Sequence, residues 1–83
     1  MRTIVEVKPL PDQKLFVRFS DGESGVFDVR PYVRSEFFRR LDDEAYFQQT
    51  RLFFGGVAWP EGHDLGPDTI AAGLEPLSQE TTR

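Results

Sequence analysis

Hydrophobic and polar residues alternate in the first third of the chain, which is the pattern of half-buried β-strands. Three such segments occur, at residues 4–7, 15–19 and 25–29. In the second segment Leu15, Val17 and Phe19 share one face, because successive side chains in a strand point to opposite sides. Asp21-Gly22 tolerates the positive φ angles of a tight hairpin. The pattern therefore predicts a three-stranded antiparallel meander.

The apolar spacing changes to that of short helices in the middle of the chain. Residues 35–41 carry apolar side chains at helical spacing behind a candidate cap, Ser35. Residues 44–49 predict a second short helix, which the acids at residues 42–43 can cap.

A second hairpin and a short last helix are predicted beyond residue 50. Strands at residues 51–54 and 57–59 flank a Gly-Gly pair at residues 55–56, which is typical of a turn. Residues 67–72 begin with proline and precede a glycine, which suits the first position and the end of a helix.

The order of these elements predicts an α+β fold. An antiparallel meander is followed by two short helices and a second hairpin, which we expect to pack so that one curved sheet results. We expect a single compact domain at residues 1–73 and a mobile polar tail at residues 74–83, where the periodicity is lost. The large rings of Phe19 and Trp59 should be buried and should pack the sheet against the helices.

The composition argues against a nucleic-acid-binding or membrane protein. The 83 residues include 10 Lys and Arg against 14 Asp and Glu, a net charge of -4, whereas phosphate backbones require a basic surface. The absence of cysteine excludes a disulfide framework, a thiol nucleophile and a cysteine-based metal site. The first residues show no long apolar run, so we expect no signal peptide, and no stretch approaches about 20 apolar residues. We therefore expect a cytoplasmic protein without membrane contact.

The segment at residues 57–68, VAWPEGHDLGPD, holds the only Trp and the only His of the chain. His63, Asp64 and Asp68 are the residue types of a metal site, or of an acid–base pair in a small hydrolase. The simpler interpretation is a polar turn in which Asp64 accepts backbone hydrogen bonds before the helix that starts at Pro67. One histidine with scattered acids favours the turn, so we assign no catalytic residue, metal ligand or cofactor.

Two pairs of adjacent phenylalanines, at residues 37–38 and 53–54, are candidates for a binding surface. Neighbours in a strand point to opposite sides, so one of Phe53 and Phe54 should leave the core. Core packing is the usual role of such rings, but large exposed side chains also anchor interfaces. We take Phe38, Arg51 and Phe54 as the candidate partner-binding residues, with the arginine at the rim.

An ordered set of motifs covers most of the chain. It comprises Ile4-Val5-Glu6-Val7, residues 15–23, Phe27-Asp28-Val29-Arg30-Pro31, Leu41-Asp42-Asp43 with Phe47, and the segment 57–68 with its structural residues Trp59, Pro60, Gly62, Asp64 and Pro67. In this order the motifs resemble those of small bacterial proteins of the domain of unknown function 2442 family. The resemblance implies a compact α+β domain and carries over no catalytic residues.

The resemblance also implies a class of function. Some members of that family are similar to antitoxin components encoded beside a small protein of the domain of unknown function 4160 family. Together with the acidic charge, this favours a protein–protein interaction domain that acts as an antitoxin-like partner of a small basic protein. The product of the adjacent gene is the first candidate for that partner. Direct nucleic-acid binding is not expected, and self-association is left open.

Overall fold

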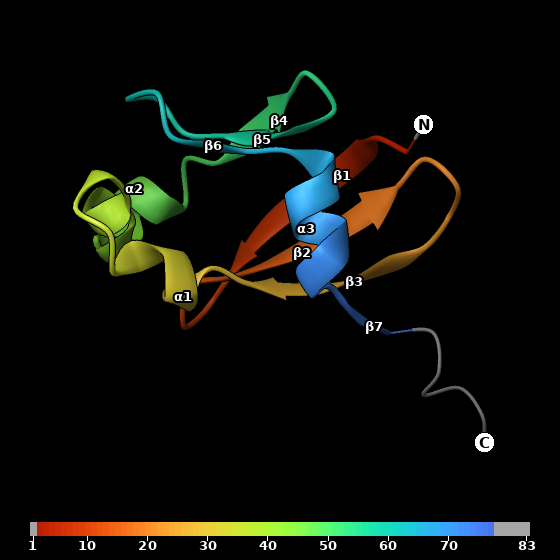
Figure 1. Ribbon diagram of the computed structural model, residues 1–83, viewed down its shortest axis with the longest axis horizontal. Helices are drawn as coiled ribbons and strands as arrows, with labels where there is room; N and C mark the ends of the chain where they lie inside the picture. The colour runs from red at the N-terminus through yellow and green to blue at the C-terminus, as the bar shows by residue number, and fades with distance from the viewer. Residues whose placement is uncertain (1, 78–83) are drawn as a thin grey trace.

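The computed structural model describes residues 2–77 and confirms the predicted meander (Figure 1). Its three antiparallel strands are β1 (Ile4–Leu10), β2 (Lys14–Phe19) and β3 (Ser24–Asp28). Leu15, Val17 and Phe19 of β2 are buried, as their alternation predicts. Gly22 has φ 96 in the turn between β2 and β3, a conformation that glycine adopts without steric strain.

Three short helical segments gather at one end of the meander (Figure 1). They are α1 (Arg30–Val33), the 3-10 helix η1 (Phe37–Asp42) and α2 (Glu44–Phe47). The last two correspond to the predicted helices. Asp43 caps α2 as predicted, because its Oδ1 accepts the backbone N–H of Ala45 at 3.0 Å. The sequence pattern does not predict α1, which has Pro31 in its first turn, where a missing N–H is harmless.

The second hairpin belongs to a separate three-stranded sheet, so the prediction of one curved sheet is wrong. The strands β4 (Arg51–Phe53), β5 (Gly56–Ala58) and β6 (Asp64–Leu65) follow this order across the sheet. The predicted hairpin is β4–β5, and β6 is an addition. The sheet lies as a second layer beside the meander (Figure 1). Stacking two sheets buries the apolar faces of both, which an extension at the edge would not do.

One hydrophobic core is shared by the two sheets and the helices. Trp59, Phe19, Phe27 and Phe47 are its largest fully buried side chains, so the predicted burial of Trp59 and Phe19 is confirmed. The Nε1–H of Trp59 donates to the backbone oxygen of Phe47 at 2.9 Å, and the two ring centroids lie 5.8 Å apart. The polar atom of the indole is therefore satisfied within the core.

The chain returns to the meander after the second sheet. The helix α3 (Pro67–Gly73) matches the predicted last helix, and the short strand β7 (Glu75–Pro76) pairs with β3. The strand β7 thus lies beyond residue 73, where the sequence predicts that the polar tail begins, and residues 78–83 of that tail lie outside the described part. Within the described part, no helix is long and apolar enough to cross a membrane.

Truncation of Trp59 should remove much of the stability of this small domain. We expect Trp59→Ala to lower the free energy of unfolding by about 3–5 kcal/mol, because it leaves a large cavity in the core. Urea denaturation checks this expectation, with Phe54→Ala as an aromatic control, since Phe54 is exposed. An unchanged unfolding midpoint in Trp59→Ala would contradict the core role of the ring.

Asp43 should make part of the stability depend on pH. The guanidinium of Arg40 donates to Oδ2 of Asp43 at 2.9 Å, and this bond, with backbone N–H groups of α2, lowers the pKa of the Asp43 carboxyl. A carboxyl with a lowered pKa stabilises the folded state above its unfolded-state pKa, and this contribution is lost as the pH falls through the folded-state pKa.

We expect Asp43→Asn to unfold with a weaker pH dependence below about pH 4, because the amide still caps α2 but does not titrate. Urea denaturation of both proteins at a series of pH values measures the difference. Parallel pH profiles for the two proteins would show that the Asp43 charge contributes nothing to acid sensitivity.

Candidate functional site

The VAWPEGHDLGPD segment forms the connection between β5 and β6. The N–H of Trp59 donates to the oxygen of His63 at 2.9 Å, and the N–H of Gly62 donates to the oxygen of Trp59 at 3.1 Å. Gly62 has φ 104, a conformation that other residues rarely adopt, and Pro60 is exposed beside it. These residues therefore close a tight loop that carries His63 back toward the core.

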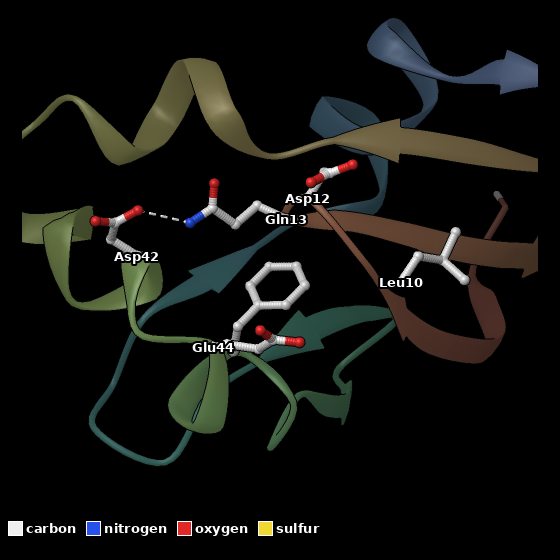
Figure 2. A pocket seen from close by; sticks show the side chains of 6 residues that line it. Leu10, Asp12, Gln13, Asp42 and Glu44 are labelled. Atoms are coloured by element: carbon white, nitrogen blue, oxygen red, sulfur yellow. Dashed lines mark hydrogen bonds between the residues drawn. The ribbon is translucent and has the colours of Figure 1, made fainter.

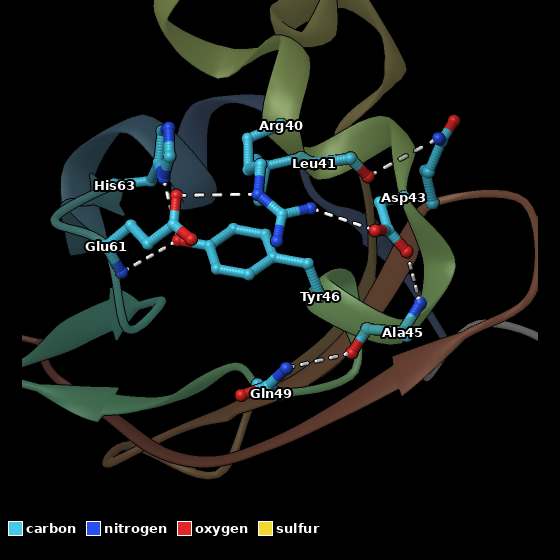
Figure 3. Close-up of polar contacts among 9 residues, drawn as sticks. Arg40, Leu41, Asp43, Ala45, Tyr46, Gln49, Glu61 and His63 are labelled. Atoms are coloured by element: carbon cyan, nitrogen blue, oxygen red, sulfur yellow. Dashed lines mark hydrogen bonds and ion pairs between the residues drawn. The ribbon is translucent and has the colours of Figure 1, made fainter.

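His63 lies in the core although its side chain is polar. Only 4% of its surface is exposed. The hydroxyl of Tyr46 lies 2.9 Å from Nδ1, and the backbone oxygen of Phe37 lies 2.6 Å from Nε2. Figure 3 shows the imidazole beside the phenol. Both ring nitrogens thus have protein partners, as burial of a polar group requires.

The partners of His63 determine where its proton lies. A carbonyl oxygen only accepts, so Nε2 must carry the hydrogen that bonds to Phe37. In the neutral ring Nδ1 then accepts from the hydroxyl of Tyr46, whose oxygen accepts the backbone N–H of Glu61 at 2.8 Å. A directed chain of hydrogen bonds therefore runs from Glu61 through Tyr46 and His63 to Phe37.

Charged side chains cover this chain on the solvent side (Figure 3). The guanidinium carbon of Arg40 lies 4.5 Å from the centroid of the Tyr46 ring. The same guanidinium pairs with Asp43 at 2.9 Å and with Glu61 at 3.4 Å, and the hydrogen bond to Asp43 is the main cause that raises the pKa of Arg40. These groups are partly exposed, so the pairs stabilise the fold only weakly. They join η1, α2 and the loop before β6.

The residues of the metal or hydrolase alternative do not converge. Asp64 and Asp68 are exposed, whereas His63 is buried with both nitrogens engaged. No three His, Cys, Asp or Glu side chains among residues 2–77 are grouped so that they could hold a metal ion. The role that the geometry gives His63 is structural, because the ring links three separate segments.

Asp64 does not cap the turn before Pro67, so that prediction is wrong. Asp64 lies in β6, where it pairs with Ala58, and its side chain is exposed. The N-cap of α3 is Gly66, and no side chain makes a capping hydrogen bond there. The extra strand β6 is the physical reason, since it turns the carboxylate to the outer face of the sheet. Pro67 begins α3 as predicted.

The roles within the first phenylalanine pair are reversed. Phe38 is half-buried against the core, with its ring edge-on to Tyr32, whereas Phe37 is 60% exposed. Phe38, a predicted partner-binding residue, is therefore the less exposed ring of the pair. The segment forms a 3-10 helix with three residues per turn, so its side chains point in other directions than α-helical spacing predicts.

Both rings of the second phenylalanine pair are exposed on the β4–β5 hairpin. Phe53 is 40% exposed and Phe54 is 91% exposed, and their ring centroids lie 4.5 Å apart. Arg51 is exposed at the start of β4. We call Arg51, Phe53 and Phe54 the hairpin surface. The sequence predicts one exposed ring here, and the structure has two.

Phe54 occupies an unusual backbone position. Phe54 and Gly55 have φ 46 and φ 85, so they form the turn in place of the predicted Gly55-Gly56. Glycine is required at position 56 for a different reason, since a Cβ there would collide with the backbone oxygen of Leu65 in β6. Gly56 thus permits the close approach of β6, and the turn falls on a residue type that is rarely found at positive φ.

A pocket of about 230 Å³ lies between the β1–β2 turn and α2 (Figure 2). Its lining consists of Leu10, Asp12, Gln13, Asp42, Glu44 and Phe47. The Nε2 of Gln13 donates to Oδ1 of Asp42 at 2.8 Å and joins the β1–β2 turn to the end of η1. Carboxylates around an aromatic ring suit a cationic side chain. Sequence reasoning misses this pocket because its acids come from distant segments.

Removal of the Tyr46 hydroxyl should show how much the buried hydrogen bonds through Tyr46 and His63 contribute to stability. Tyr46→Phe leaves Nδ1 of His63 and the N–H of Glu61 without this partner, so we expect a loss of about 1–3 kcal/mol in the free energy of unfolding. Urea denaturation measures the loss. Tyr32→Phe is the matched control, since no hydrogen bond of the Tyr32 hydroxyl occurs within the described part. Equal stability of the two variants would contradict a role for the chain.

Comparison with known proteins gives the family of the chain. A family model described as "Protein of unknown function (DUF2442)" matches residues 4–76, which include every strand and helix described above. No curated protein and no solved structure gives a significant match. The extent of the family match confirms the resemblance inferred from the ordered motifs. The chain belongs to the DUF2442 family of proteins of unknown function.

Proposed function

We propose that this domain is a protein–protein interaction domain, and that it binds a small basic protein around Phe54. The observation that carries the proposal is an exposed ring in a strained conformation. Phe54 is 91% exposed and has φ 46. A non-glycine residue in this region costs of order 1–3 kcal/mol. Folding alone would favour Gly or Asn at this position, so a binding role accounts for the phenylalanine.

The neighbours of Phe54 have the composition of an interface. Phe53 extends the aromatic surface, and Arg51 lies on the same strand with an exposed guanidinium. Aromatic residues and arginine supply most of the binding energy in many interfaces. Phe38 has no part in this surface because it packs against the core.

The charge of the domain supports a basic partner. Several cations are already neutralised by acids of the same chain, namely Arg2, Lys8, Arg18, Arg30 and Arg40. Asp64 lies beside the rings of the hairpin surface and pairs with no cation among residues 2–77, and the acidic pocket adds further carboxylates. Complementary charge speeds encounter with a cationic protein and is screened by salt.

An antitoxin-like role is the specific form of this function that we propose. Such a domain needs no catalytic residues, because it blocks its partner by covering the partner's working surface. The product of the adjacent gene is the first candidate. A small hydrolase or metal-binding protein is the alternative, and its support is weak because His63 is fully engaged while Asp64 and Asp68 point to solvent.

Phe54→Asn separates binding from folding. Asn tolerates positive φ, so we expect the stability to stay the same or to rise by up to about 1 kcal/mol. The loss of the ring should abolish capture of the adjacent gene product. The measurement is co-expression with that product, followed by size-exclusion chromatography at low and high salt and a growth assay.

Phe37→Ala is the control for this experiment, because it removes an exposed ring that belongs to η1 and not to the hairpin surface. We expect it to retain the complex. If the wild-type domain forms no complex with this product and restores no growth, the antitoxin-like proposal fails. If Phe54→Asn binds as well as wild type, the proposed surface is the wrong one.

A further inference from the structure

The outer face of the three-stranded sheet carries a trough that runs along β5. Ala58 of β5 lies on its floor, and the exposed residues of β4 and β6 form its walls. Two hollows of about 110 Å³ and about 280 Å³ lie over it, and Phe53 and Asp64 line both. The two hollows share Phe53 and Asp64 in their linings, so they lie next to each other on this face.

Opposite charges lie on the two walls of the trough. Arg51 pairs with Ala58, and Ala58 pairs with Asp64, so these residues form one row across the sheet. Two strand spacings put the outer residues of the row about 9–10 Å apart. Neither Arg51 nor Asp64 forms an ion pair with another residue of the described part. Each charge is therefore available to a group outside this copy.

The next row combines a large ring with an open place. Phe53 pairs with Gly56, and Gly66 lies against Gly56, since a Cβ on Gly56 would come within 3.0 Å of the Cα of Gly66. A Cβ on Gly66 would meet nothing within 4 Å. One wall thus presents an aromatic side chain, and the other leaves room for one.

We propose that the trough binds the trough of a second copy of this chain, with the two-fold axis parallel to β5. This axis lays the β4 wall of each copy over the β6 wall of the other. Arg51 of each copy then faces Asp64 of the other, and each Phe53 ring enters the open place above Gly66 of the other. The contact does not depend on the proposed basic partner.

The charges select this orientation. A two-fold axis perpendicular to the strands would place Arg51 against Arg51 and Asp64 against Asp64, and like charges in contact are unfavourable. The parallel axis turns both contacts into attractive ones. The paired surfaces are small, so the dimer should be weak and reversible, and its exposed ion pairs should weaken further with salt.

Charge reversal tests the arrangement with the protein itself. Sedimentation velocity over a wide concentration range should show wild type shifting from the 9.5 kDa monomer to a dimer. Arg51→Glu and Asp64→Arg should each weaken the dimer at least about ten-fold, because like charges then face each other. The combined variant should restore it, since the reversed charges again meet in opposite pairs. The melting temperature of each variant shows that the monomer is folded.

Gly66→Val provides a second test that changes no charge. The space above Gly66 is open and its φ of -76 suits any residue, so the monomer should fold normally while the entry of Phe53 is blocked. We expect dimerisation to be lost. A wild-type chain that stays monomeric at all concentrations overturns the proposal. So does a combined charge variant no stronger than the single ones, or a Gly66→Val dimer as strong as wild type, because either result places the contact elsewhere.

Discussion

The two ends of the Trp59 side chain connect different parts of the fold, and the arrangement of the second sheet depends on this. The ring fills the core, while the indole N–H holds the end of α2 through the carbonyl of Phe47. Tyr46 directly precedes Phe47, and His63 follows Trp59 by one loop. Once Trp59 is in place, the hydroxyl of Tyr46 is therefore within reach of the imidazole. The packing of Trp59 in the core thus brings together the groups that form the hydrogen bond between Tyr46 and His63.

The chain of hydrogen bonds through Tyr46 and His63 adds specificity that the apolar core lacks. Hydrophobic burial has no direction, so it alone would not fix how η1 sits against the loop before β6. The hydrogen bonds of His63 have direction, and they bring a backbone carbonyl of η1 to one defined position. A buried imidazole without partners would destabilise the domain. In this protein both ring nitrogens of His63 and the hydroxyl of Tyr46 have hydrogen-bond partners, so the cost of burying them is offset.

The strands of the meander could be predicted because their signals are local. Leu15, Val17 and Phe19 alternate within one segment, and the Asp-Gly turn lies next to them. The errors concern properties that distant segments decide. Phe38 is half-buried because Tyr32 and the core lie beside it, and Asp64 is displaced by its pairing with β5. The partners of His63 lie 17 and 26 residues away, and no local pattern indicates them.

The close approach at Gly56 has a consequence for the register of the hairpin. Considered alone, the segment Phe53-Phe54-Gly55-Gly56 offers two competing turns, and the pair of glycines would be the easier one. A slip to that turn would move β4 by two residues against β5 and would pair Phe54 with the buried Val57. It would also take Gly56 out of the strand in which it accommodates the carbonyl of Leu65. Pairing with β6 therefore selects the register of β4 against β5. The exposure of the Phe54 ring thus depends on a segment that lies outside the hairpin.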